Sequence, residues 1–126
     1  MSLAAPLARV RGLGSARQGT QLWWQQRWTA IALAPLGLWF LYSLLRVNPR
    51  DYGALLEWIG SPLNAILLIL FVAAMFHHAQ LGVQVVIEDY VEPEWQKIGC
   101  VILVRFLALF AALASILAIL KIFLGV

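Results

Sequence analysis

Three long apolar runs dominate the pattern of hydrophobic and polar positions along the chain. They cover residues 28–45, 62–87 and 98–124. The ionisable residues inside these runs are His77, His78, Arg105 and Lys121. A stretch of roughly 18 or more apolar residues is typical of a membrane-spanning helix, because about 20 residues rising about 1.5 Å each cross a hydrocarbon core of about 30 Å. The pattern therefore predicts an all-α integral membrane fold with three transmembrane helices.

Polar residues and aromatic rings mark the ends of the runs. Charged or turn-forming residues occupy positions 46–51 and 88–94, and Ser61 before Pro62 is a predicted N-cap for the second helix. The aromatic residues near the run ends are Trp23, Trp24, Trp28, Tyr52, Trp58, Tyr90 and Trp95. Amphipathic rings of this kind settle at the headgroup level of a bilayer. The loops are short, so we expect residues 1–126 to form one membrane domain.

Composition supports this class of protein and excludes others. With 63% hydrophobic and 12% charged residues, the chain holds more apolar side chain than a soluble domain of this length buries, so the excess faces lipid. The sequence has no glycine-rich phosphate loop, no nucleophile elbow and no cysteine pair, since Cys100 is the single cysteine. We therefore do not expect the chain by itself to be a complete enzyme or to bind nucleic acid.

The distribution of Lys and Arg predicts the orientation in the membrane, because positive charge near a span resists translocation. The basic residues are Arg9, Arg11, Arg17 and Arg27 before the first run, Arg46 and Arg50 in the first loop, Lys97 in the second loop, Arg105 within the third run and Lys121 near the C-terminus. The excess before the first run predicts that residues 1–27 form a cytoplasmic arm. The C-terminus then lies on the opposite side.

The second run carries the polar residues that are most informative about function. Ionisable side chains inside a span are costly, so they tend to face a bundle interior, a cofactor or a water-filled path. His78, Gly82 and Asp89 share one helical stripe, and Gly82 leaves room beside the imidazole for a flat macrocycle. A b-type haem needs such an axial histidine. On the alternative interpretation, both histidines only pack between helices, and Gln80 and Gln84 form interhelical hydrogen bonds.

Two sequence segments resemble a known family. His78-Ala79, followed by Gly82 and then by residues 89–91 (Asp-Tyr-Val), resembles the signature of the membrane-anchor D subunit of succinate dehydrogenase, or complex II. Residues 27–33 (Arg-Trp-Thr-Ala-Ile-Ala-Leu) resemble the start of the first span of that family. Residues 11–24 are similar to the alphaproteobacterial branch that is related to mitochondria. The resemblance covers nearly the whole chain.

This resemblance implies a role for each matching residue. His78 would be the axial ligand that binds the iron of haem b, with the second axial ligand on a partner protein. Arg27 would lie near the haem propionates. Tyr90 would hydrogen-bond a carbonyl of ubiquinone, and Asp89 would lie at the edge of that quinone site. His77 has no counterpart in the family pattern and is expected to be a structural neighbour.

The resemblance also implies partners and a location. The three helices would pack against a second membrane anchor of the cytochrome b556 type, and both anchors would hold a flavoprotein subunit and an iron-sulfur subunit on a bacterial inner membrane. FAD and the iron-sulfur clusters would lie only on those partner proteins, and ubiquinone would be the substrate that receives the electrons. Two alternatives remain open: the anchor of a quinol:fumarate reductase, and a structural membrane subunit without a cofactor.

Overall fold

The computed structural model describes residues 13–126, with side chains from Thr20 onward. These described residues form four helices: α2 (Leu13–Arg46), α3 (Tyr52–Gly60), α4 (Pro62–Tyr90) and α5 (Glu94–Leu124). Three of them have stretches long and apolar enough to cross a membrane, at Thr20–Arg46, Pro62–Tyr90 and Glu94–Leu124. The described residues contain no strand. The predicted all-α fold with three candidate membrane spans is confirmed.

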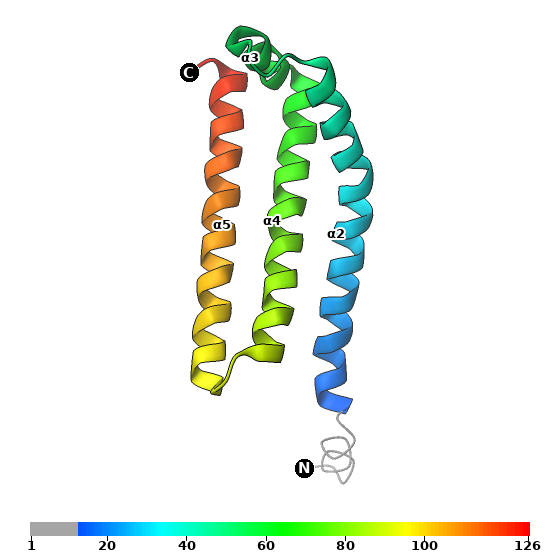
Figure 1. The fold of residues 1–126 in the computed structure, drawn as a ribbon, viewed down its shortest axis with the longest axis vertical. Helices are drawn as coiled ribbons and strands as arrows, with labels where there is room; N and C mark the ends of the chain where they lie inside the picture. The colour runs from blue at the N-terminus through cyan, green and yellow to red at the C-terminus, as the bar shows by residue number, and fades with distance from the viewer. Residues whose placement is uncertain (1–12) are drawn as a thin grey trace.

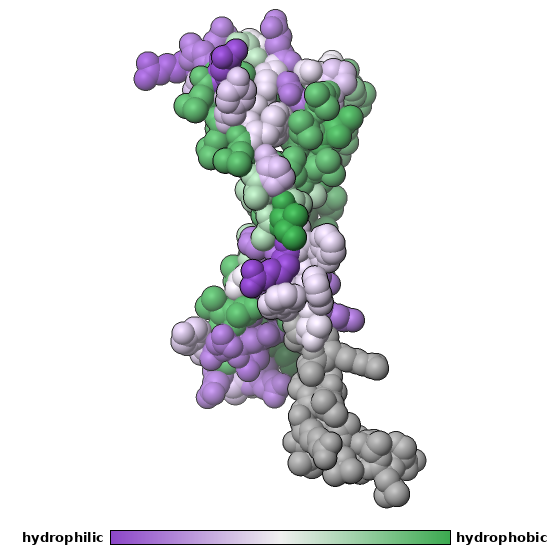
Figure 2. Space-filling model, turned by 90° about the vertical axis from the view of Figure 1, so that its right-hand side faces the viewer, coloured by the Kyte–Doolittle hydropathy of each residue, from purple (hydrophilic) through white to green (hydrophobic). Residues whose placement is uncertain are grey.

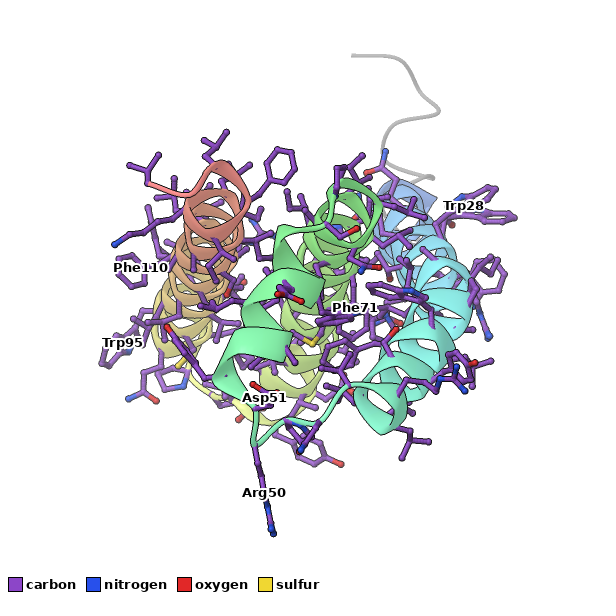
Figure 3. All side chains as sticks on the ribbon, turned by 90° about the horizontal axis from the view of Figure 1, so that it is seen from above. Trp28, Arg50, Asp51, Phe71, Trp95 and Phe110 are labelled. Carbon is purple, nitrogen blue, oxygen red and sulfur yellow. The ribbon has the colours of Figure 1, made fainter. Side chains whose placement is uncertain are left out.

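The long helices stand side by side in a single layer (Figure 1). The central helix α4 contacts both α2 and α5, whereas α2 and α5 do not contact each other over the described part of the chain. Seen from above, the three helices form a row with α3 lying across one end (Figure 3). Among the described residues, no further long helix covers the two broad faces of α4.

Helix α2 begins earlier in the chain than the apolar run that predicted it. It starts at Leu13 and continues without a break to Arg46, so part of the predicted arm is helical. Pro35 lies inside this helix. The remainder of the predicted arm, residues 1–12, lies outside the described residues, and so do Arg9 and Arg11.

The apolar runs did not predict α3, which follows the first polar loop. Asp51 is its N-cap, and the Asp51 carboxylate accepts a hydrogen bond from the backbone N–H of Ala54 at 3.2 Å. Such a cap satisfies one of the N–H groups that a helix start leaves without a partner. Ser61 caps the start of α4 with Pro62 as the first helical residue, as predicted, although the Ser61 side chain makes no capping hydrogen bond.

The largest buried cluster lies at the α3 end of the layer. Ala65 and Leu68 of α4 pack there with Ile119 of α5. Around them, the rings of Trp39 and Trp58 stack with centroids 5.7 Å apart.

Few other residues from Thr20 onward are buried. The most apolar window of each candidate span is only 6%, 17% and 0% buried, in chain order. The rings of Trp28, Trp95 and Phe110 point away from the layer (Figure 3). On the α2 edge, hydrophobic side chains form a band in the half near α3, below a hydrophilic tip, and more hydrophilic side chains gather over the other half (Figure 2). The outward faces are therefore available to lipid or to a partner protein.

Candidate functional site

A hydrogen bond between α2 and α4 holds the imidazole of His78. Its Nδ1 lies 2.8 Å from Oγ1 of Thr29, and both side chains are half-buried. The same hydroxyl lies 2.8 Å from the backbone oxygen of Gln25 and 3.0 Å from that of Gln26. His78 is therefore oriented by a group on the neighbouring helix. The sequence did not predict this contact, since no local pattern links Thr29 to a residue so distant in the chain.

His77 lies on another side of α4. Its side chain is exposed and lines a cavity of about 320 Å³ between α4 and α5, together with Gln80 and Arg105. Adjacent residues of a helix point about 100° apart, so the two histidines face different neighbours. His78 is the one that a second helix positions.

Gly82 follows His78 by about one helical turn. Apart from its chain neighbours and the nearby backbone of its own helix, a Cβ atom built at Gly82 would meet no described atom within 4 Å. The small residue therefore leaves open space on the stripe of His78. That space suits a flat group or a close helix from a partner.

Asp89 and Tyr90 end α4, about three turns from His78. Both side chains are exposed, Tyr90 to 82%. Neither makes a side-chain hydrogen bond to any other residue that the structure describes. Their polar groups are therefore free to meet a ligand or a partner at this end of the layer.

Arg27 lies two residues before Thr29 on α2, which places it on nearly the opposite side of that helix. Its guanidinium carbon lies 5.1 Å from the ring centroid of Trp23. The structure thus brings His78 together with Thr29, and not with Arg27. A role of Arg27 at haem propionates stays a prediction.

A polar network between α4 and α5 was only partly predicted. Gln84 is 5% exposed, and its Oε1 accepts hydrogen bonds from Gln80 at 3.0 Å and from Arg105 at 3.3 Å. Its Nε2 donates to the carboxylate of Glu88 at 3.0 Å. The spacing of residues 80, 84 and 88 puts them on one helical face and was visible in the sequence. The hydrogen bond to Arg105 could not be predicted from the sequence, because it joins two helices and depends on the fold.

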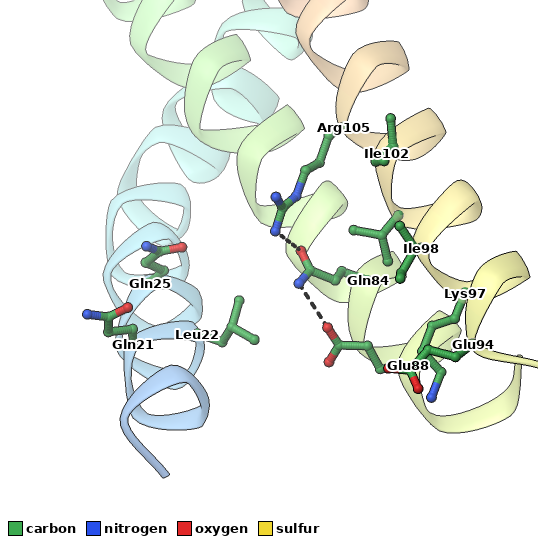
Figure 4. A pocket seen from close by; sticks show the side chains of 11 residues that line it. Gln21, Leu22, Gln25, Gln84, Glu88, Glu94, Lys97, Ile98, Ile102 and Arg105 are labelled. Carbon is green, nitrogen blue, oxygen red and sulfur yellow. Dashed lines mark hydrogen bonds between the residues drawn. The ribbon is translucent and has the colours of Figure 1, made fainter. Parts of the chain in front are cut away.

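This network borders a cavity that is larger than the one beside His77 (Figure 4). The cavity measures about 560 Å³ and lies between α2, α4 and α5. Gln25 lies on its α2 side, Glu88 on α4, and Lys97 and Arg105 on α5. It is open and is lined by charges of both signs, so this end of the molecule is more polar than the end at α3.

The fold and the site together define a class: a helical membrane protein with three candidate spans, whose central span presents an oriented histidine. Residues 1–117 match the succinate dehydrogenase/fumarate reductase transmembrane subunit family, and the chain belongs to that family. The family predicted from the two segments around Arg27 and His78 is confirmed. No solved structure matches the chain.

Curated relatives support this membership. A protein of Rickettsia bellii (strain RML369-C) named succinate dehydrogenase hydrophobic membrane anchor subunit is 34% identical over 115 residues, which are 91% of this chain and 92% of the relative. A protein of the same name from Paracoccus denitrificans is 31% identical and covers 84% of this chain and 82% of its own length. The succinate dehydrogenase membrane anchor subunit of Reclinomonas americana is 28% identical over 96 residues, covering 74% of this chain and 80% of its own.

Proposed function

We propose that this chain is the hydrophobic membrane anchor of a succinate:ubiquinone oxidoreductase, in which it holds haem b through His78 and contributes Asp89 and Tyr90 to the ubiquinone site. The observation that carries the haem assignment is the contact between Nδ1 of His78 and the Thr29 hydroxyl at 2.8 Å. It occupies one ring nitrogen and leaves Nε2 to bind iron. Histidines that ligate metals commonly have this second contact.

The surroundings of His78 fit a haem. The imidazole is half-buried inside a span, and the open space at Gly82 lies on the same stripe. Since His77 faces α5, this chain would supply one axial ligand, and the second anchor, of the cytochrome b556 type, would supply the other. When bound, haem b provides a one-electron redox centre. His78 would hold the iron and fix the orientation of the ring.

Arg27 suits a role at the propionates through its charge and its free edge. A guanidinium that stacks on an aromatic face keeps its N–H groups available in the plane. The guanidinium carbon of Arg27 lies over the ring of Trp23, 5.1 Å from its centroid, at the end of α2 that lies away from α3. It would donate charge-assisted hydrogen bonds to a propionate.

The ends of α4 and α5 away from α3 suit a quinone head group. Tyr90 would donate its phenolic hydrogen to a carbonyl of ubiquinone, and Asp89 would lie beside it. A site at this level offers polar partners for the head group and lipid for the isoprenoid tail. With a cytoplasmic N-terminus, this end faces the cytoplasm, where the flavoprotein and iron-sulfur subunits would dock with FAD and the clusters.

The first experiment is a reduced-minus-oxidised optical spectrum of the purified complex. We expect His78→Ala to lose the b-type band, because the iron loses an axial ligand, whereas His77→Ala retains it. His77 is the matched control, because it is a histidine of the same helix that faces α5 and not α2. An unchanged band in His78→Ala would contradict the axial assignment. A natural complex without any b-type band would leave only the anchor role.

A further inference from the structure

Thr29 is placed to do more than connect α2 with α4. Its Oγ1 lies within hydrogen-bonding distance of three groups: the backbone oxygens of Gln25 and Gln26 at 2.8 and 3.0 Å, and Nδ1 of His78 at 2.8 Å. A hydroxyl has one hydrogen to donate and two lone pairs that accept. The number of available hydrogens therefore decides whether Thr29 or His78 is the donor in their hydrogen bond.

The two carbonyl oxygens can only accept, so the hydroxyl hydrogen points to them. Two oxygen atoms 2.8 Å apart repel unless a hydrogen lies between them. Threonine in a helix commonly donates to the carbonyl three or four residues earlier. The lone pairs of Oγ1 then face the imidazole, and Nδ1 of His78 must carry the hydrogen.

We propose that Thr29 is the positioning residue for His78: it accepts the Nδ1–H, fixes the tautomer in which Nε2 has the free lone pair, and holds the plane of the ring. The chain of donors runs from the imidazole N–H to the Thr29 hydroxyl and from that hydroxyl to the Gln25 carbonyl. This inference rests on the proposed role of His78 as axial ligand. It adds a residue of another helix to the haem site.

Two features make the arrangement rigid. Thr29 is β-branched and its hydroxyl is tied to its own helix, so its side chain has little rotational freedom. Both partners are half-buried, which limits competition from water. The acceptor also belongs to α2, so a shift of α2 relative to α4 would turn the ring. The packing of the two helices is thereby coupled to the geometry of the haem ligand.

The test uses Thr29→Val and Thr29→Ser in the assembled complex. Valine has the shape of threonine without the hydroxyl, whereas serine keeps the acceptor. The readouts are the midpoint potential of the haem, the low-spin electron paramagnetic resonance signal of the oxidised haem, and the rate of haem transfer to an excess of haem-free globin. We expect Thr29→Val to shift the first two and to weaken haem retention about 10- to 100-fold, the usual effect of losing such a partner. Thr29→Ser should restore all three.

Ser115→Ala is the matched control. Ser115 of α5 donates to the backbone oxygen of Ala111 at 2.8 Å, the same back-bond that Thr29 makes, and it has no imidazole partner. Its loss should leave the potential, the resonance signal and haem retention unchanged. If Thr29→Val does not assemble, Thr29→Ala gives the same test, because alanine is smaller and also has no side-chain acceptor.

The outcomes separate this inference from the proposed function. If Thr29→Val, or Thr29→Ala in its place, matches the natural complex in all three readouts while His78→Ala loses the haem band, Thr29 does not position the ligand and the axial role stands. If His78→Ala retains the band, the axial role and the positioning role are both overturned. A shift in Ser115→Ala equal to that in Thr29→Val would assign the effect to helix back-bonding and overturn the positioning role.

Discussion

The two adjacent histidines have different surroundings because neighbouring residues of a helix point about 100° apart. His78 reaches the Thr29 hydroxyl on α2, and His77 borders the cavity against α5. Polar groups in a span have few partners, so which helix a residue faces largely decides what it can bind. The same reasoning applies at the end of α4. There Asp89 and Tyr90 are exposed, whereas Glu88 is occupied by Gln84.

Replacement of Tyr90 by phenylalanine tests the quinone contact at single-atom level. Tyr90→Phe removes one hydroxyl from an exposed ring. A hydrogen bond contributes about 0.5–1.5 kcal/mol, so we expect the KM for ubiquinone to rise about 2- to 10-fold. The haem spectrum should stay unchanged. Steady-state kinetics of quinone reduction measure the effect.

Tyr52 provides the comparison for this experiment. It is similarly exposed, at 73%, and begins α3 at the other end of the layer. Tyr52→Phe should leave the KM unchanged. Equal kinetics for the natural complex and Tyr90→Phe would assign Tyr90 to the aromatic belt at the membrane surface instead.

The central helix α4 carries nearly all of the candidate chemistry because it alone contacts both neighbours. Its side toward α2 holds His78, and its side toward α5 holds the network around Gln84. Arg105 lies on α5 within the third apolar run, where an unpaired charge is costly. Gln84 connects Arg105 to Glu88, so charges on two helices share one buried amide.

We predict that Gln84→Leu destabilises the pairing of α4 and α5. Arg105 would lose its hydrogen bond to Gln84, and the hydrogen bonds of Gln84 to Gln80 and Glu88 would also be lost. Hydrogen bonds to charged groups contribute about 1.5–3 kcal/mol, so thermal unfolding of the complex in detergent should occur at a clearly lower temperature. The double variant Gln84→Leu with Arg105→Met removes the unpaired charge as well. It should recover much of the loss, and a double variant weaker than the single one would argue against this network.

At the scale of the whole molecule, the chain is an incomplete bundle. A row of three helices with a small core at one end cannot bury its own apolar faces, as the 6%, 17% and 0% burial of its span windows indicates. In a bilayer, lipid covers part of this surface. The faces on each side of α4 remain suited to helices of a partner, which fits the proposed pairing with a second anchor protein.

The orientation can be tested on this architecture by labelling engineered cysteines in a Cys100→Ser background. Arg50 lies before α3 and Glu92 lies between α4 and α5, so they mark opposite ends of the layer. We expect a membrane-impermeant maleimide to label Arg50→Cys from outside spheroplasts, and Glu92→Cys only in inverted vesicles. The reverse pattern would place the N-terminus outside and the proposed quinone site on the wrong side for its partners.

Much of this protein was determined by sequence alone, because the lengths of apolar runs and the positions of charges act locally. They predicted the three spans, and the segments around Arg27 and His78 predicted the family. The ends of the helices were harder to predict from the sequence. The first helix starts at Leu13, well inside the predicted arm, and α3 is too short to register as an apolar run.

Only the tertiary structure decided which distant side chains meet. Thr29 with His78 and Gln84 with Arg105 are contacts between different helices, and they depend on the rotation and depth at which each helix packs. Apolar periodicity constrains that rotation weakly in helices that are hydrophobic on nearly every side. The sequence could therefore name His78 as a candidate ligand, whereas the hydroxyl that orients it emerged from the packing of α2 on α4.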